Sequence, residues 1–180
     1  MIKKIIAVIL FQTAILSFAL SQDFLKRDTL PKPAKEPFWS WDRIYVGGGL
    51  GLQFGNITLV NISPDIGYRI TKRYSAGVGL RYIYFSDKYY NYTQNIYGGS
   101  VFNRFNITDF LFPHAEYEVL NGEWIRHFPR YNLVNIWVGG GLQQSLGSSS
   151  FNVMALWNLN ESIDNPFPNP QIRVGINVGL

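Results

Sequence analysis

The chain contains no cysteine, and this absence excludes several classes of protein. A disulfide framework and a Cys-based metal site both require thiols, and a lipid-anchored lipoprotein requires a cysteine at its cleavage point. Charge is also scarce: Asp, Glu, Lys and Arg together make up 16% of the residues, against about a quarter in ordinary soluble domains. A soluble surface is normally dense with lysine and glutamate, so this composition argues against a conventional soluble surface.

Helical periodicity is missing as well, because no convincing 3.6-residue pattern of apolar residues follows Asp42. The chain instead shows runs in which apolar and small or polar residues alternate, which is the period of a β-strand with two unlike faces. A length of 180 residues fits one domain. Eight such runs are predicted as strands: 43–54, 57–70, 75–85, 96–107, 110–120, 131–144, 151–159 and 170–180.

The first 21 residues have the pattern of a secretory signal peptide. Lys3 and Lys4 precede an apolar core, and the small residues of Ala19-Leu20-Ser21 offer a cleavage site that leaves Gln22 first. The alternative is an N-terminal membrane anchor. Residues 22–42, with the proline-rich LPKPAKEP, are predicted to form an extended periplasmic linker before a barrel at 43–180. Loss of the two signal lysines lowers the net charge from +4 to +2, so nucleic acid is not an expected partner.

The stretch RIYVGGGLGLQFGN, residues 43–56, raises the question of which strand face meets which environment. Its bulky face is apolar, and its other face is glycine-rich. Glycines and uncharged polar residues suit the interior of a narrow eight-stranded barrel, which only just holds side chains. The bulky face then meets lipid, and barrel closure pairs every backbone group. The predicted fold is an all-β, eight-stranded antiparallel up-and-down transmembrane β-barrel, because most runs approach the 9–11 residues that a tilted strand needs to cross a bilayer.

The alternation places most of the strand charges on the inner face. Arginines in a dry lumen need carboxylate partners, so these residues are predicted to form a polar network that fills the lumen. Pro64 and Pro113 fall on the outer face and are predicted to require β-bulges, because proline lacks a ladder donor. The predicted lumen polar network is Asp65, Arg69, Arg81, Arg104, His114, Glu116, Glu118 and Arg173.

Three longer loops are predicted at residues 86–95, 121–130 and 160–169. Longer loops outside the cell and short turns in the periplasm are typical of outer-membrane barrels. The loops contain four aromatic candidates for surface contact, Tyr89, Tyr90, Tyr92 and Trp124. Aromatic side chains are favoured contact residues, although packing onto the barrel rim is the alternative role.

With these features together, the chain resembles the outer-membrane β-barrel-domain family, of the small OmpA/OmpX-like eight-stranded type. The resemblance rests on the signal peptide, GGGLGLQFG, SPDIGYRITKRYSAGVGLRY, IYGGSVFNRF and the final IRVGINVGL, although many members end in Phe rather than Leu180. It implies a monomer in the outer membrane, surrounded by outer-membrane lipid and lipopolysaccharide. It also implies recognition of the C-terminal strand by the barrel-assembly machinery.

The expected function is structural, or surface contact or adhesion through the loops, with no catalytic residues, cofactor or metal. Three alternatives stay open at this point. A lipid-modifying enzyme would draw on His127 with Glu123, or on Ser86 with Asp87, but no nucleophile motif surrounds these residues. A narrow channel would need cavities beside the glycines. A soluble lipocalin-like binder would need the two faces reversed, with apolar residues inside.

Overall fold

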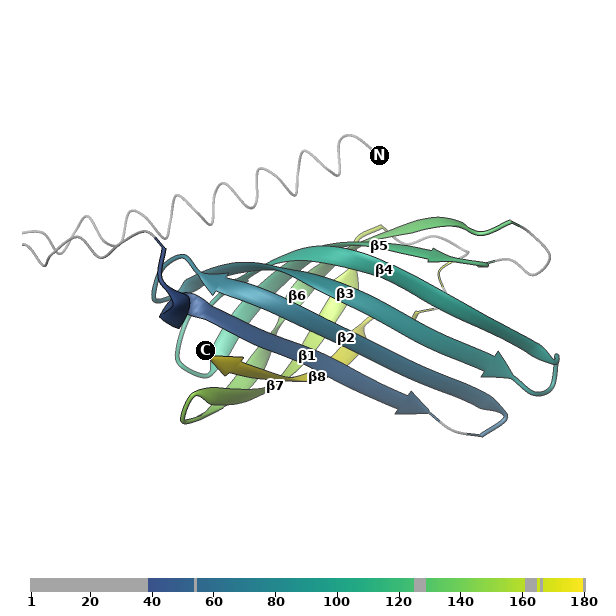
Figure 1. Cartoon of the computed structure of the whole chain (residues 1–180), viewed down its shortest axis with the longest axis horizontal. Helices are drawn as coiled ribbons and strands as arrows, with labels where there is room; N and C mark the ends of the chain where they lie inside the picture. The colour runs from purple at the N-terminus through teal and green to yellow at the C-terminus, as the bar shows by residue number, and fades with distance from the viewer. Residues whose placement is uncertain (1–38, 54, 125–128, 161–164, 166, 180) are drawn as a thin grey trace, which may run out of the picture. The chain divides into compact units, whose positions relative to one another are not determined.

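The structure is a computed structural model that describes residues 39–53, 55–124, 129–160, 165 and 167–179. It is all-β: eight antiparallel strands close into a barrel in sequence order, which confirms the predicted eight-stranded up-and-down topology (Figure 1). Among the described residues, no helix is both long and apolar enough to cross a membrane. The strands are β1 (Ile44–Gln53), β2 (Ile57–Arg69), β3 (Tyr74–Asp87), β4 (Tyr92–Phe105), β5 (Leu111–Gly122), β6 (Tyr131–Leu146), β7 (Ser149–Asn158) and β8 (Gln171–Gly179).

The region before the barrel is described only at its end. The predicted signal peptide, the predicted linker up to residue 38, and Leu180 lie outside the described residues. The last two residues of the predicted linker are not extended, because Trp41 and Asp42 form a short 3₁₀ helix, η1 (Trp41–Arg43), immediately before β1.

The two ends of the barrel differ in their connections. The β2–β3, β4–β5 and β6–β7 connections lie at the end where β8 finishes, which we call the turn end (Figure 1). These connections are short, and Thr71 Oγ1 accepts hydrogen bonds from the backbone N–H groups of Arg73 and Tyr74 at 3.2 and 2.9 Å. Gly147 has φ +64° at the first position of a two-residue turn, as a type II′ hairpin requires. The other end, with the remaining four connections, we call the loop end.

The predicted loop at residues 86–95 is wrong. The β3–β4 ladder continues to the pair Asp87↔Tyr92, which leaves only residues 88–91 as a turn. Asp87 Oδ1 accepts the backbone N–H groups of Tyr89 and Tyr90 at 2.9 and 3.2 Å. Asn91 adopts a left-handed φ of 45°, which asparagine tolerates better than most residues. This turn chemistry closes a tight hairpin within a stretch whose polarity indicated a loop.

The two outward prolines do not produce the predicted bulges. The β1–β2 register runs unbroken through Gly48↔Pro64, and the β5–β6 register runs unbroken through Pro113↔Gly140. On its other side, β2 pairs with β3 at Ile62↔Tyr82 and again at Asp65↔Gly79 without a change of register. Pro64 has no backbone N–H group to donate, and positions 63 and 64 of β2 do not pair with β3. The strand therefore accommodates the proline without inserting an extra residue.

The two faces of the barrel have opposite character. Most outward side chains are apolar and many are exposed, with Leu50, Leu80 and Ile172 between 63% and 68% exposed, whereas Ala115 and Ile136 on the outer face of β5 and β6 are buried. Inward side chains are buried and include both the charged residues and large apolar groups such as Trp137 and Phe112. The expectation that the apolar face points outward is confirmed, and the reversed arrangement that a lipocalin-like binder would need is wrong.

Inward glycines make room for large neighbours. Tyr45 is the pairing partner of Gly67, and a Cβ atom on that glycine would overlap the tyrosine ring. At Gly139 the obstacle is backbone, because a Cβ atom would overlap the carbonyl oxygen of Ala155. The glycine-rich face predicted from the sequence therefore has a steric reason at these positions.

Replacing Gly139 with alanine is expected to lower the free energy of unfolding by about 1–3 kcal/mol, because a methyl group cannot displace a paired backbone. Chemical denaturation of the refolded protein in detergent micelles measures this loss. Gly51→Ala is the matched control, since its Cβ atom would meet only the Asn61 side chain, at 3.5 Å or more. Equal stability of the two variants would show that the wall is not closely packed at Gly139.

Candidate functional site

The lumen contains a buried charged cluster contributed by three strands. Arg81 on β3 forms an ion pair with Glu118 on β5, with Nη1 2.8 Å from Oε1. Arg173 on β8 donates to Glu116 Oε2 at 2.5 Å, and His114 Nε2 lies 3.3 Å from the same oxygen. Arg173 Nη2 also lies 4.0 Å from Glu118 Oε1. These contacts bring five of the predicted lumen residues together.

Glu118 is the most buried charged residue in the described part of the barrel, with 1% exposure. Besides Arg81, it accepts hydrogen bonds on Oε2 from Trp137 Nε1 at 2.9 Å and from Asn135 Nδ2 at 3.0 Å. Asn135 Oδ1 in turn accepts from Asn158 Nδ2 at 2.8 Å. A buried carboxylate is retained at low cost only when its lone pairs are satisfied in this way.

Asn135, Trp137 and Asn158 also belong to the network and were not among its predicted members, although they lie on the same inner face. The alternation on β6 and β7 already indicated that these three side chains point inward. Their partnership with Glu118 depends on which strands face each other across the lumen, and alternation within one strand does not contain that information.

Two other predicted residues lie within the lumen but in different surroundings. Arg104 is buried, with its guanidinium carbon 4.5 Å from the centre of the Phe112 ring and 6.0 Å from that of Phe102. The Phe102 ring also stacks on His114, at 5.6 Å between centroids. Asp65 on β2 is half-buried, and its Oδ1 has no hydrogen-bond partner among the described residues.

Arg69 differs from the other predicted lumen residues. It lies at the last position of β2, at the turn end, where it is exposed, and its guanidinium carbon lies 5.6 Å from the centre of the Tyr45 ring. The alternation correctly predicted that Arg69 lies on the inner face, but this residue is at the mouth of the barrel. Arg69 therefore lines the opening rather than the buried cluster.

Toward the loop end the lumen is filled by apolar side chains. Ile83, Ile96 and Leu120 form a buried cluster, against which Leu59, Trp124 and Phe167 pack. Phe167 comes from the long β7–β8 connection and also packs against a second buried cluster of Phe112, Trp137, Met154 and Leu156. We call Ile83, Ile96, Leu120, Leu59, Trp124 and Phe167 the apolar plug. It separates the charged cluster from the loop end.

The four predicted contact aromatics have three different positions. Tyr89 and Tyr90 lie on the β3–β4 turn, 83% and 58% exposed, with their rings edge to face at 4.8 Å. Tyr92 is not a loop residue, because it begins β4, and its hydroxyl donates to the carbonyl of Glu123. Trp124 belongs to the apolar plug, and its Nε1 donates to the carbonyl of Tyr131 at 3.0 Å. Only the tyrosine pair on the turn is presented to the surroundings.

Ser86 and Asp87, two of the residues considered for catalysis, form hydrogen bonds within the β3–β4 hairpin. Ser86 Oγ lies 3.1 Å from Thr93 Oγ1 across the β3–β4 ladder, and Asp87 closes the adjoining turn. His127 lies outside the described residues. Within the described ranges, no group of three or more His, Asp or Glu side chains is placed to hold a metal ion. The arrangement is one of buried ion pairs and hydrogen bonds.

No protein-family model matches the chain, and a search of curated proteins finds no match.

Proposed function

We propose that this protein is an integral β-barrel of the outer membrane that acts without catalysis. The observation that carries the proposal is the outward display of large apolar side chains on most of the barrel wall, with β5 the least exposed strand. A monomeric soluble protein rarely exposes so large an apolar surface, whereas the lipid-facing band of a membrane barrel is apolar. Each of the eight strands carries at least one exposed apolar residue, and examples are Leu50, Ile66, Val78, Val101, Leu111, Leu142, Val153 and Ile176.

Strand length and closure support the same proposal. The strands have 9 to 16 residues, and about 9–11 suffice for a tilted strand to cross the hydrocarbon core. Exposed aromatics on the outer face, such as Tyr97 and Trp157, suit the interfacial girdles of such barrels. In this setting outer-membrane lipid and lipopolysaccharide surround a monomer, and the assembly machinery recognises β8.

The filled lumen favours a structural or contact role over transport. Ion pairs, amides and the apolar plug occupy much of the interior, and the loop-end connections offer exposed side chains for recognition. The exposed Tyr89 and Tyr90 pair is the contact site that we propose on this surface.

Membrane fractionation combined with gel mobility tests the proposal. The protein is expected in the outer-membrane fraction, with a band that shifts when the sample is boiled, because a closed barrel resists detergent until heated. A soluble protein whose mobility does not change on boiling would contradict it.

A narrow channel is the second candidate, since a cavity of about 450 Å³ opens at the turn end beside Tyr45, Arg69 and Arg104. The apolar plug lies between that opening and the loop end, so we expect no resolvable current steps in planar bilayers. Phe167→Ala removes the plug residue shared by both apolar clusters. The currents of this variant are compared with those of the unaltered protein in the same recordings. Stable steps from the unaltered protein would show that the lumen conducts.

A further inference from the structure

The barrel wall is incomplete between its first and last strands. β1 and β8 pair over only five positions, from Tyr45↔Gly179 to Gly49↔Gly175. Beyond Gly49, β1 continues to pair with β2 as far as Gln53, and β8 pairs with β7 as far back as Gln171. The two strands therefore separate toward the loop end (Figure 1).

Local packing indicates the same separation. A Cβ atom on Gly49 would lie 2.8 Å from the carbonyl oxygen of Val174 on β8. Two residues further, a Cβ atom on Gly51 would meet only Asn61 of β2, at 3.5 Å or more. We call the unpaired part of this seam, between residues 50–53 and 171–174, the lateral port.

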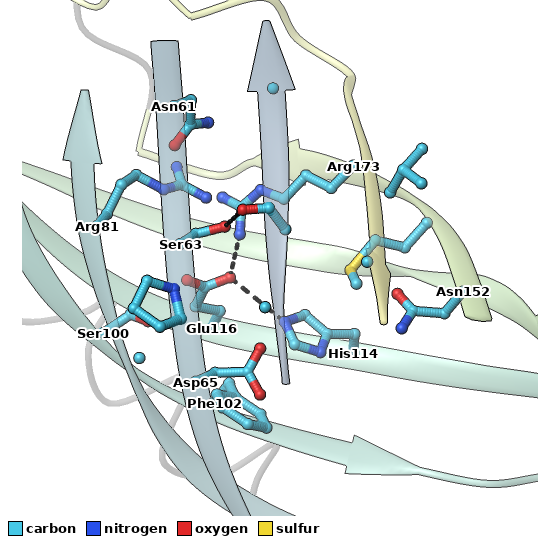
Figure 2. A pocket seen from close by; sticks show the side chains of 18 of the residues that line it. Asn61, Ser63, Asp65, Arg81, Ser100, Phe102, His114, Glu116, Asn152 and Arg173 are labelled. Carbon is cyan, nitrogen blue, oxygen red and sulfur yellow. Dashed lines mark hydrogen bonds and ion pairs between the residues drawn. The ribbon is translucent and has the colours of Figure 1, made fainter. Parts of the chain in front are cut away.

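A polar cavity of about 130 Å³ lies behind the lateral port, bounded by β1 and β8 and by the charged cluster (Figure 2). Several residues that line it have a buried side-chain polar atom without a hydrogen-bond partner in the described part of the chain. These atoms include the acceptors Asn61 Oδ1, Asp65 Oδ1 and Asn152 Oδ1 and the donors Arg104 Nε and Arg173 Nη2. Asn152 and Arg104 are 1% and 7% exposed. Buried polar atoms normally have partners, so this cavity is built to hold a polar group.

The charges of the cavity define what that group is. Three arginines and three carboxylates line it, so its formal charge is zero with His114 neutral. Unpartnered guanidinium donors favour a phosphate, and unpartnered carboxylate and amide oxygens favour a group that carries N–H donors. A simple anion or cation would satisfy only one of the two sets, whereas water or a zwitterionic group satisfies both. A cavity of this volume has room for about four waters, which excludes a sugar chain.

Outside the seam lies an apolar groove. It has a volume of about 370 Å³, and its larger side chains are Leu50, Ile62, Pro64, Phe151, Val174 and Ile176. Glycines at positions 47–49 and 175 form its floor and keep the wall thin between the groove and the polar cavity. The groove covers the paired part of the seam and meets the lateral port at Leu50 and Val174. A polar cavity and an apolar groove that meet at this edge match the two halves of an amphiphile.

We infer that the lateral port binds a zwitterionic phospholipid whose head group carries a primary ammonium. The phosphate lies against Arg173 and Arg104, the ammonium donates to Asp65 and Asn152, and an acyl chain lies in the outer groove. This inference rests on the proposed position of the barrel in a bilayer. A choline head group has no N–H donor and leaves the Asp65 and Asn152 oxygens unsatisfied, so it is discriminated against.

Native mass spectrometry of the protein released from nanodiscs tests the inference. The nanodiscs contain equal amounts of phosphatidylethanolamine and phosphatidylcholine with the same acyl chains. We expect one retained phosphatidylethanolamine per barrel, enriched about tenfold over phosphatidylcholine, which corresponds to about 1.4 kcal/mol. No retained lipid, or equal retention of the two lipids, would overturn the inference.

Two variants connect the lipid to the port. Gly51→Leu places a side chain in the open space beside Asn61 and is expected to abolish retention. Ala76→Leu adds apolar volume on β3, outside the residues that line the port, and is expected to leave retention unchanged. Retention by Gly51→Leu at the level of the unaltered protein would overturn the inference.

Two further measurements separate the possible failures. Free phosphoethanolamine, added in excess, is expected not to displace the lipid, because it lacks the chain that occupies the groove. Complete displacement would show that a soluble ligand is bound instead. Gel mobility with and without boiling is measured on the same nanodisc sample. A heat-sensitive barrel without retained lipid refutes the port alone, whereas a protein that does not fold in nanodiscs refutes the proposed function.

Discussion

Replacing Val78 with arginine is expected to lower the free energy of unfolding in a lipid bilayer by about 2–4 kcal/mol. Val78 lies on the outer face of β3 and is 57% exposed, and its pairing partners Ile66 and Val101 are 55% and 50% exposed. The substitution removes little internal packing, so the cost comes from placing a charge among acyl chains. Denaturant unfolding in phosphatidylcholine vesicles, followed by tryptophan fluorescence, measures it.

The size of this effect separates a membrane barrel from a soluble one. On a water-exposed surface, the same substitution normally changes stability by no more than about 0.5 kcal/mol. Val78→Arg should therefore be markedly destabilised in vesicles. Stability equal to that of the unaltered protein would contradict the membrane proposal.

Leu146→Arg is the matched control. Leu146 is 67% exposed and is also an outward apolar residue, but it ends β6 at the turn end. There an arginine reaches the head groups, so the expected cost is about 0–1 kcal/mol. A similar large loss at both positions would point to a general intolerance of arginine rather than to depth in a bilayer.

The faces of the strands were predictable because the alternation has a period of two and continues through each run. One residue of slip would have reversed every side chain, and none occurs within the strands that carry Arg81, His114 and Arg173. The same argument placed Glu116 and Glu118 inside on β5. Alternation thus identified the members of the charged cluster before any contact was known.

The contacts between strands were not predictable in the same way. Glu118 meets Arg81 from β3 and Trp137 from β6, and these meetings depend on the closure and stagger of the barrel. The lateral port depends on the same closure, since only the β1–β8 register shows where pairing stops after Gly49. A single sequence without known registers carries neither fact.

The compact turn after β3 and the role of Trp124 were also not evident from the sequence. Residues 86–95 are polar and indicated a loop, yet the Asp87 side chain and the left-handed Asn91 build a compact hairpin. Trp124 was considered as a contact residue, with packing onto the barrel rim as the alternative role, and the structure favours the alternative. It packs at 6.0 Å, centroid to centroid, with Phe167 in the apolar plug. Composition shows only how polar a segment is. The compact hairpin and the packing of Trp124 depend on the contacts of individual side chains.

Glu118→Gln is expected to lower the free energy of unfolding by about 3 kcal/mol, because it leaves the guanidinium of Arg81 buried without its carboxylate. The ion pair measures 2.8 Å, and its side chains are 4% and 1% exposed. Glutamine keeps the side-chain volume and an acceptor oxygen for Trp137 and Asn135. The loss of stability therefore measures the effect of removing the negative charge. Asp109→Asn, at an exposed turn-end position, is the control and should change stability by less than about 0.5 kcal/mol.

A double-mutant cycle with Arg81→Met distinguishes an ion pair from two independent buried groups. Arg81→Met alone leaves Glu118 charged and is also expected to cost about 3 kcal/mol. The double variant removes both charges and should lose about as much as one single variant, which gives a coupling energy of about 3 kcal/mol. Additive losses would show that Arg81 and Glu118 do not depend on each other. The lumen would then be stabilised by the amides around Asn135 and by the apolar plug rather than by its charges.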